Sequence, residues 1–168
     1  NAWLAGRIER ALTLLEAARP LVSEPIQRAD VDRYLGLIEM TRGVPADACQ
    51  LLLRAAEEVA SSDGQRALEL LNIAGLAAAY AGDLEAAVAI AEAARALTVA
   101  ETPFVRMLAQ LLIGLGDHAQ GDFAAAAPKL REALELAEKL DDDAMSEQPV
   151  ELLFAGRAAL YLGDDQAT

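Results

Sequence analysis

Residues 79–87 read Ala-Tyr-Ala-Gly-Asp-Leu-Glu-Ala-Ala, a stretch that predicts the end of one helix, a tight turn and the start of a second helix. Gly82 can adopt the left-handed backbone conformation that commonly ends an α-helix. The carboxylate of Asp83 can accept a hydrogen bond from a free amide in the first turn of the next helix. The Gly-Asp dipeptide recurs at residues 121–122 and 163–164. The stretch therefore predicts a helical hairpin that is repeated along the chain.

The glycines repeat with a nearly constant period. Eight of the eleven form pairs in which the second glycine follows the first by seven residues: Gly36 and Gly43, Gly75 and Gly82, Gly114 and Gly121, and Gly156 and Gly163. The second glycines at 43, 82 and 121 are 39 residues apart, and the last follows after 42. Periods of about 20–50 residues are typical of solenoids. The first glycine of each pair lies inside a helix, so we attribute it to close approach of the partner helix.

Small residues recur at fixed distances after the second glycine. Alanine stands five residues after it, at Ala11, Ala48, Ala87 and Ala126, and again twelve residues after it, at Ala18, Ala55, Ala94 and Ala133. Nine residues after it stand Leu15, Leu52, Ala91 and Leu130. These positions share one helical face, so the second helix of each pair is predicted to lie close against the first. We expect Ala87→Leu or Ala126→Leu to disturb this packing.

Composition and pattern together predict an all-α fold. Apolar residues make up 54% of the chain, many of them alanine, and aromatic residues only 4%. Alanine is the best helix former, whereas the β-branched and aromatic runs that favour strands are scarce. We predict a right-handed α-α superhelix of about four antiparallel helix pairs, with an incomplete pair at each end.

The whole chain, residues 1–168, is predicted to be a single repeat domain. It would consist of a half-repeat at 1–22, helix pairs at 26–60, 64–98 and 103–140, and a half-repeat at 147–168. The predicted helices cover residues 7–20, 26–42, 45–60, 64–81, 84–98, 103–120, 123–140 and 147–162. Pro128 lies inside the seventh helix and should kink it or delay its regular start. Because the pattern is cut at both ends, we expect the chain to be a segment of a longer protein.

Charge and cysteine content limit the partners and the compartment. The formal net charge is −13, from 27 acidic and 14 basic residues. Such a surface repels phosphate backbones and anionic lipid headgroups, so we predict that this segment binds neither nucleic acid nor membranes. Cys49 is the single cysteine, which rules out a disulfide within the chain. A reducing, cytoplasmic location is expected.

The pattern of glycine, seven-residue step, Gly-Asp turn and two spaced alanines resembles the tetratricopeptide repeat (TPR). TPRs favour tryptophan four residues before the first glycine, where this chain has Asp32, Leu71, Gln110 and Leu152. They favour tyrosine three residues after it, where this chain has Glu39, Ala78, Asp117 and Ala159. The TPR period is about 34 residues, so the period of 39 indicates a divergent, TPR-like class.

Three stretches are similar to the helical-repeat arms of large ATP-dependent LuxR-type regulators of bacterial transcription. They are residues 79–87, Ala-Trp-Leu-Ala-Gly-Arg-Ile-Glu-Arg-Ala at 2–11, and Gly-Asp-Phe-Ala-Ala-Ala-Ala-Pro-Lys-Leu at 121–130. In that family a nucleotide-binding switch domain precedes the arm and a helix-turn-helix domain follows it. The arm receives an inducer or a regulatory protein. The resemblance implies an effector- or protein-binding module that transmits binding to the activity and self-association of the regulator.

The face of each first helix opposite its partner predicts a binding strip, because first helices line the concave side of a curved stack. Counting from the first glycine of each pair places these side chains along the strip: Arg33, Leu37, Met40, Asn72, Leu76, Tyr80, Leu111, Leu115, His118, Leu153, Arg157 and Tyr161. An apolar strip with a few polar groups suits a peptide, a protein segment or a small organic effector. Alternatively, the leucines are packing residues and the polar groups an ordinary hydrated surface.

The inventory of reactive side chains argues against an enzyme. One histidine, His118, and one cysteine are too few for a zinc site of usual composition or for a Cys-His pair with an orienting group. No Gly-rich phosphate loop ending in Gly-Lys-Ser/Thr is present. We expect no cofactor and no metal. His118 is interpreted as a surface or hydrogen-bonded residue, and Cys49 as an inert packed residue.

Three hypotheses for function remain. The first is the sensor arm of a LuxR-type regulator, and the second is a generic TPR-like scaffold for protein–protein interaction, unrelated to transcription. The third is a hydrolase that uses surface carboxylates, and no sequence motif supports it. Self-association through the exposed repeat ends is expected in addition, because the half-repeats lack their partner helices.

Overall fold

The protein is all-helical in a computed structural model that describes residues 8–140, 156, 158, 159 and 161–163. Within these residues there are seven α-helices and no strand, which confirms the all-α prediction. The helices are α1 (Ile8–Ala18), α2 (Pro25–Arg42), α3 (Pro45–Val59), α4 (Gly64–Ala81), α5 (Leu84–Ala96), α6 (Pro103–Ala119) and α7 (Phe123–Ala137), with a short 3-10 helix, η1 (Arg19–Leu21), after α1. None of the helices in this described part is both long enough and apolar enough to cross a membrane.

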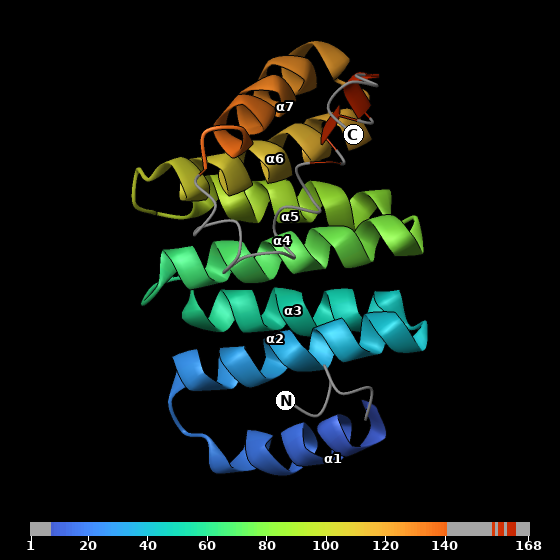
Figure 1. The fold of residues 1–168 in the computed structure, drawn as a ribbon, viewed down its shortest axis with the longest axis vertical. Helices are drawn as coiled ribbons and strands as arrows, with labels where there is room; N and C mark the ends of the chain where they lie inside the picture. Colours follow the sequence, from blue (N-terminus) through green and yellow to red (C-terminus); the bar gives the residue numbers. More distant parts are fainter. Residues whose placement is uncertain (1–7, 141–155, 157, 160, 164–168) are drawn as a thin grey trace.

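The helices follow one another along the long axis of the molecule in chain order, from α1 at one end to α7 at the other (Figure 1). Each helix packs against the next one in the chain. In addition, α2 contacts α4, and α4 contacts α6. Among the described residues no comparable contacts join α3 to α5 or α5 to α7. The first helices of the pairs therefore form a continuous layer, whereas the second helices stand further apart.

The turns between the helices of a pair have the predicted geometry. Gly43, Gly82, Gly121 and Gly163 all have positive φ, between 68° and 89°. At the middle turn the amide of Asp83 donates to the carbonyl of Ala78 at 2.9 Å, which satisfies a free carbonyl at the end of α4. The Asp83 carboxylate in turn accepts from the amide of Ala86 at 2.9 Å. Asp122 caps α7 in the same way, through the amide of Ala125 at 3.0 Å.

Helix boundaries differ from the prediction mainly where helices end. The first helix gives way to η1 at Arg19, next to Pro20, whose ring cannot continue an α-helix. The predicted delay at Pro128 is wrong, because α7 starts at Phe123 and runs through the proline. Pro128 is exposed, so water can reach the backbone groups that its missing amide leaves unpaired. The predicted helix at 147–162 lies largely outside the described residues.

The repeated small residues lie in the helix interfaces. Of the eight alanines at the two repeated positions, all but Ala18 and Ala87 are buried. The first glycine of two pairs has the predicted role. A Cβ atom on Gly36 would lie 2.7 Å from Cγ of Leu52 on the partner helix. One on Gly114 would lie 2.9 Å from Cγ of Leu130. In both pairs a leucine thus packs directly onto a glycine.

The pair formed by α4 and α5 departs from this arrangement. Nine residues after the second glycine, at the leucine position of the repeat, this pair has Ala91, which is too short to cover Gly75. A Cβ on Gly75 would instead meet Leu112 of the next pair, at 3.1 Å. Ala91 packs on Gly116 of α6 so closely that a Cβ there would overlap its own. As a result α4 and α5 pack less extensively on each other than the helices of the other two complete pairs.

Two buried carboxylates connect neighbouring helices. Asp32 is only 2% exposed and accepts hydrogen bonds from Arg19 at 2.6 and 3.1 Å. Asp117 on α6 is paired with Arg95 on α5 and, at 2.9 Å, with Lys129 on α7. Both acids stand at positions where the TPR pattern has an aromatic residue. Ion pairs therefore take the place of aromatic packing at these positions.

Candidate functional site

A pocket of about 270 Å³ opens between α4, α5 and α6. It is closed on one side by Tyr161, which comes from the last described stretch of the chain. The residues that line it are Gly75, Ala78, Ala79, Gly82, Asp83, Leu84, Ala87, Ile90, Leu112, Leu115, His118, Ala119 and Tyr161. The lining is mostly apolar, with one acid and two aromatic polar side chains. Concave, apolar sites with few polar groups are typical of ligand-binding pockets.

The pocket lies where the helix pair α4–α5 is loosely packed. Gly75 and Ala78 of α4 face it with little or no side chain, and Ala87 and Ile90 of α5 form the adjoining wall. In the other complete pairs a leucine fills the corresponding surface over the glycine, as Leu130 does beside Gly114. The pocket therefore arises because α5 packs closely on α6 and leaves α4 partly uncovered.

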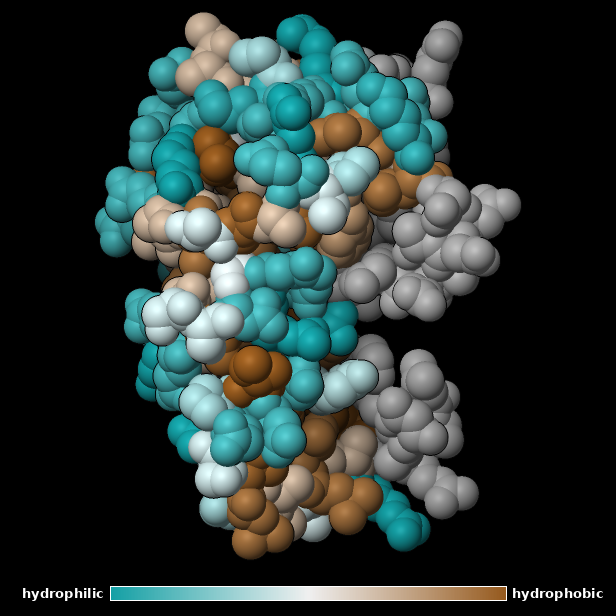
Figure 2. Space-filling model, turned by 90° about the vertical axis from the view of Figure 1, so that its left-hand side faces the viewer, coloured by the Kyte–Doolittle hydropathy of each residue, from teal (hydrophilic) through white to brown (hydrophobic). Residues whose placement is uncertain are grey.

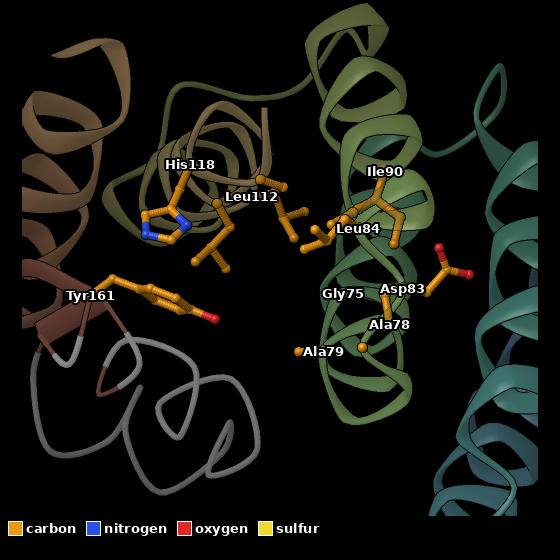
Figure 3. Close-up of a pocket in the computed structure, with 13 residues that line it drawn as sticks. Gly75, Ala78, Ala79, Asp83, Leu84, Ile90, Leu112, His118 and Tyr161 are labelled. Atoms are coloured by element: carbon orange, nitrogen blue, oxygen red, sulfur yellow. The ribbon is translucent and has the colours of Figure 1, made fainter. Parts of the chain in front are cut away.

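An aromatic group forms the opposite side of the pocket. The rings of His118 and Tyr161 lie 4.5 Å apart between centroids, and His118 also meets Phe123 of α7 edge-on at 5.0 Å. Figure 3 shows the hydroxyl of Tyr161 directed across the pocket toward α4, where Ala79 lies. Tyr161 is 44% exposed, so its ring borders both the pocket and the solvent. The aromatic edge thus offers ring faces and one hydroxyl to an incoming molecule.

The one carboxylate in the lining is turned away from the pocket. In Figure 3 the Asp83 side chain points toward α3, on the far side of the turn from Tyr161. One of its oxygens is held by the amide of Ala86. Consistently, burial raises the pKa of the Cys49 thiol on α3, and the charge of Asp83 raises it further. Asp83 therefore caps α5 and acts on α3 rather than on the pocket.

The predicted strip is only partly an accessible surface. Three of its residues are buried, which contradicts a place on an open groove: Leu37, Asn72 and Leu111. Five are half-buried: Arg33, Met40, Leu76, Leu115 and His118. Tyr80 is 71% exposed and does not line the pocket, whereas Tyr161 does. Leu153 and Arg157 lie outside the described residues. The strip is interrupted because α4 contacts both α2 and α6, so the first helices do not leave one continuous open face.

Three of the predicted residues meet at the pocket: Leu115, His118 and Tyr161. The alanines and glycines of α4 and the side chains of α5 were missed, because sequence reasoning assigned the site to first helices only. One signal was present in the sequence. The leucine position of the repeat is occupied by Ala91 in this pair alone among the four copies, which marks a gap in the packing.

Asn72 is the most unusual of the buried strip residues. It is 1% exposed, and neither its amide nitrogen nor its amide oxygen has a hydrogen-bond partner among the described residues. A buried polar group without a partner is unfavourable by about 1–3 kcal/mol. It lies one turn before Gly75 but outside the lining of the pocket. We therefore count it as a destabilising feature of the helix layer and not as part of the site.

A second hollow of about 750 Å³ lies between α3 and α5, over the start of α4. Its walls carry a run of alanines: Ala56, Ala60, Ala67, Ala89, Ala93 and Ala96. Ser61, Ser62 and Thr98 border it near the loops. This hollow exists because α3 and α5, the second helices of adjacent pairs, do not pack on each other.

The surface outside these hollows carries separate hydrophobic patches. Figure 2 shows such patches among hydrophilic residues, one of them at the end of the stack formed by α1. Exposed large hydrophobic side chains at this end are Leu14, Leu21 and Ile26, which are 56%, 84% and 39% exposed. Within the described part of the chain, no three His, Cys, Asp or Glu side chains are grouped as they would be around a metal ion.

Comparison of the chain with protein-family models, with curated proteins and with solved structures finds no match. Inference about function therefore depends on the repeat pattern and on the geometry of the pocket.

Proposed function

We propose that this chain is a non-catalytic, TPR-like module that binds an effector in the pocket between α4, α5 and α6. The observation that carries the proposal is the pocket itself, which combines an apolar lining with the aromatic pair of His118 and Tyr161. Pockets of this kind bury most of the surface of a small ligand and use a few polar groups to orient it.

The parent protein would be a cytoplasmic LuxR-type transcription regulator, and its helix pairs would follow one another as a right-handed superhelix. The similarity of residues 2–11, 79–87 and 121–130 to the arms of that family supports this origin. Succession of helices along one axis, with α2, α4 and α6 in contact, is compatible with such a superhelix. The residues on either side of this segment test the origin. A nucleotide-binding motif before it and a helix-turn-helix after it are expected, and the absence of both would contradict it.

The pocket also suggests how binding would reach the rest of the regulator. A ligand in it would touch α4, α5 and α6 and also Tyr161, which lies more than 40 residues further along the chain than Ala119 at the end of α6. Binding would therefore favour one arrangement of Tyr161 relative to the helix pairs that form the rest of the pocket. The exposed side chains of Leu14 and Leu21 support self-association through the opposite end.

A thermal-shift screen of metabolites and short peptides tests effector binding. It would compare the unchanged chain with Ala79→Leu, which places a larger side chain in the pocket, and with Ala81→Leu, an exposed control on the same helix outside the lining. A true effector at about 100 times its Kd should raise the Tm of the unchanged chain and of the control by about 5–10 °C. It should leave the Tm of Ala79→Leu unchanged. Equal shifts in all three proteins would place binding elsewhere.

The second candidate function is a protein–protein scaffold, which the hollow between α3 and α5 favours. Its volume of about 750 Å³ and its alanine-lined walls leave room for side chains of a partner segment. If this hollow is the functional surface, Ala93→Glu should weaken co-purification of the partner, while Ala79→Leu should not. The reverse result would favour the effector pocket.

A further inference from the structure

The volume of the pocket limits the size of its ligand. The space measures about 270 Å³. For comparison, an apolar cavity of about 150 Å³ lined by leucine, isoleucine and phenylalanine can hold benzene. The pocket can therefore receive one or two fused rings, and a peptide of several residues would not fit inside it.

The walls limit the polarity of the ligand. Apart from Asp83, His118 and Tyr161, the described lining consists of glycine, alanine, leucine and isoleucine. The backbone amides and carbonyls behind these residues are largely paired within the helices. A sugar or a nucleotide would bury several polar groups without partners, at about 1–3 kcal/mol each. The walls thus favour a ligand with an apolar body.

The charges around the pocket disfavour an anion. No lysine or arginine is among the described lining residues, and the whole chain carries a net charge of −13. The carboxylate of Asp83 points toward α3, so it does not face a cation in the pocket either (Figure 3). Burying an unpaired charge is strongly unfavourable. An uncharged ligand therefore fits best.

The aromatic side chains at the edge of the pocket can orient a bound ligand. His118 and Tyr161 are tilted by 59° to each other at 4.5 Å, and an added ring can pack against them offset or edge-to-face. The hydroxyl of Tyr161, directed across the pocket, can form one hydrogen bond with a bound molecule.

We propose that the pocket binds a planar, uncharged compound of one or two aromatic rings, whose single polar group hydrogen-bonds the Tyr161 hydroxyl. This ligand class rests on the proposed function above, since it specifies the effector of the same pocket. Tyr161 is then the residue that distinguishes ligands carrying the polar group from those lacking it.

Isothermal titration calorimetry of the full chain with three probes tests the ligand class. Indole has two fused rings and one N–H donor, 1-methylindole lacks the donor, and indole-3-carboxylate adds a negative charge. Indole should bind, and 1-methylindole should bind about 3- to 10-fold more weakly, as expected for one lost neutral hydrogen bond. Indole-3-carboxylate should bind at least about 10-fold more weakly than indole, because it meets no cation.

Two variants connect these affinities to the pocket. Tyr161→Phe removes only the hydroxyl, so it should weaken indole and abolish the difference between indole and 1-methylindole. Ala79→Leu should weaken both probes, while the exposed control Ala81→Leu should not. Circular dichroism and the Tm of each variant show whether it is folded as the unchanged chain is.

The outcomes separate this inference from the proposed function. An unchanged indole to 1-methylindole ratio in Tyr161→Phe, or tight binding of indole-3-carboxylate, would overturn the ligand class. If none of the three probes binds, but a compound from the broader screen binds the unchanged chain and not Ala79→Leu, the class is wrong and the effector pocket stands. If no probe and no compound of the screen distinguishes Ala79→Leu from the unchanged chain, the ligand class and the effector pocket are both wrong.

Discussion

The helix pairs α4–α5 and α6–α7 follow one sequence pattern and pack in two different ways. In α6–α7, Leu130 lies directly on Gly114, and the two helices interlock. In α4–α5 the leucine position holds Ala91, which packs on Gly116 of the following pair. The surface beside Gly75 is left open and becomes the pocket. A shorter side chain at one packing position can therefore open a pocket between helices, with the turns and caps unchanged.

Loss of the leucine that packs on Gly114 should have the largest effect on stability. Leu130 is 1% exposed, so Leu130→Ala leaves a cavity beside Gly114, and the free energy of unfolding should fall by about 3 kcal/mol. Urea denaturation measures this change. Leu115→Ala removes a half-buried leucine that borders the pocket, and the fall there should be about 1 kcal/mol. Equal losses would mean that the side of α6 that borders the pocket is packed as tightly as the side that contacts α7.

A larger side chain at the first repeated alanine should also destabilise the pair α6–α7 more than the pair α4–α5. Ala126 is 2% exposed, so Ala126→Leu overpacks the interface and should destabilise the chain by about 2 kcal/mol. The repeat pattern alone predicts the same disturbance at Ala87, and the structure corrects this expectation. Ala87 is half-buried and lines the pocket, so Ala87→Leu has space available and should change stability by less than about 1 kcal/mol. Thermal denaturation measures both. A destabilisation by Ala87→Leu as large as that by Ala126→Leu would argue against an open pocket.

Replacement of the in-helix glycine by alanine should destabilise the chain in one pair and stabilise it in the other. Replacing glycine inside a helix gains about 1 kcal/mol of helix propensity. At Gly114 the new Cβ would lie 2.9 Å from Leu130 and 3.3 Å from Lys129, so Gly114→Ala should be destabilising by about 1 kcal/mol net. At Gly75 it would meet only a terminal methyl of Leu112, at 3.1 Å. Gly75→Ala should therefore stabilise the chain by about 0.5 kcal/mol, measured by chemical denaturation. Destabilisation at both positions would refute this difference.

The smallest expected difference concerns the turns, which are equivalent. Asp83 and Asp122 each accept one hydrogen bond from the first turn of the next helix, at 2.9 and 3.0 Å. Asp83→Ala and Asp122→Ala should each lower the free energy of unfolding by about 1 kcal/mol. Asp83→Asn and Asp122→Asn, which keep the cap, serve as controls. A difference of more than about 0.5 kcal/mol between the two alanine variants would show that the turns are not equivalent.

Most helix boundaries could be predicted because they depend on neighbours in the chain. The positive φ of Gly82 and Gly121 and the caps of the aspartates that follow them are local features. Interfaces within a pair were also accessible to pattern reasoning, since residues such as Ala48 and Ala55 share one face at helical spacing and are buried. For Pro128 the predicted delay of the helix start was wrong, since α7 begins at Phe123 and continues through the exposed proline.

The candidate site was predicted only in part. The strip assumed that one face of every first helix is open, but α4 contacts both α2 and α6, and Leu37, Asn72 and Leu111 are buried. His118 and Tyr161 were named for their place on the strip, but their pairing across 43 residues of chain could not be deduced from spacing. Contacts between distant segments depend on how whole helices pack.

Local chemistry along the chain was enough to specify helices, turns and the faces that pair within a hairpin, because capping and close approach act between residues a few positions apart. The position of the pocket was decided by the packing of α4, α5 and α6 against one another. Helices from two different pairs compete there for the same small surfaces, and Ala91 can contact Gly116 or approach Gly75, but not both. Spacing along the sequence does not determine which of the two glycines Ala91 contacts. That depends on how the whole helices pack against one another.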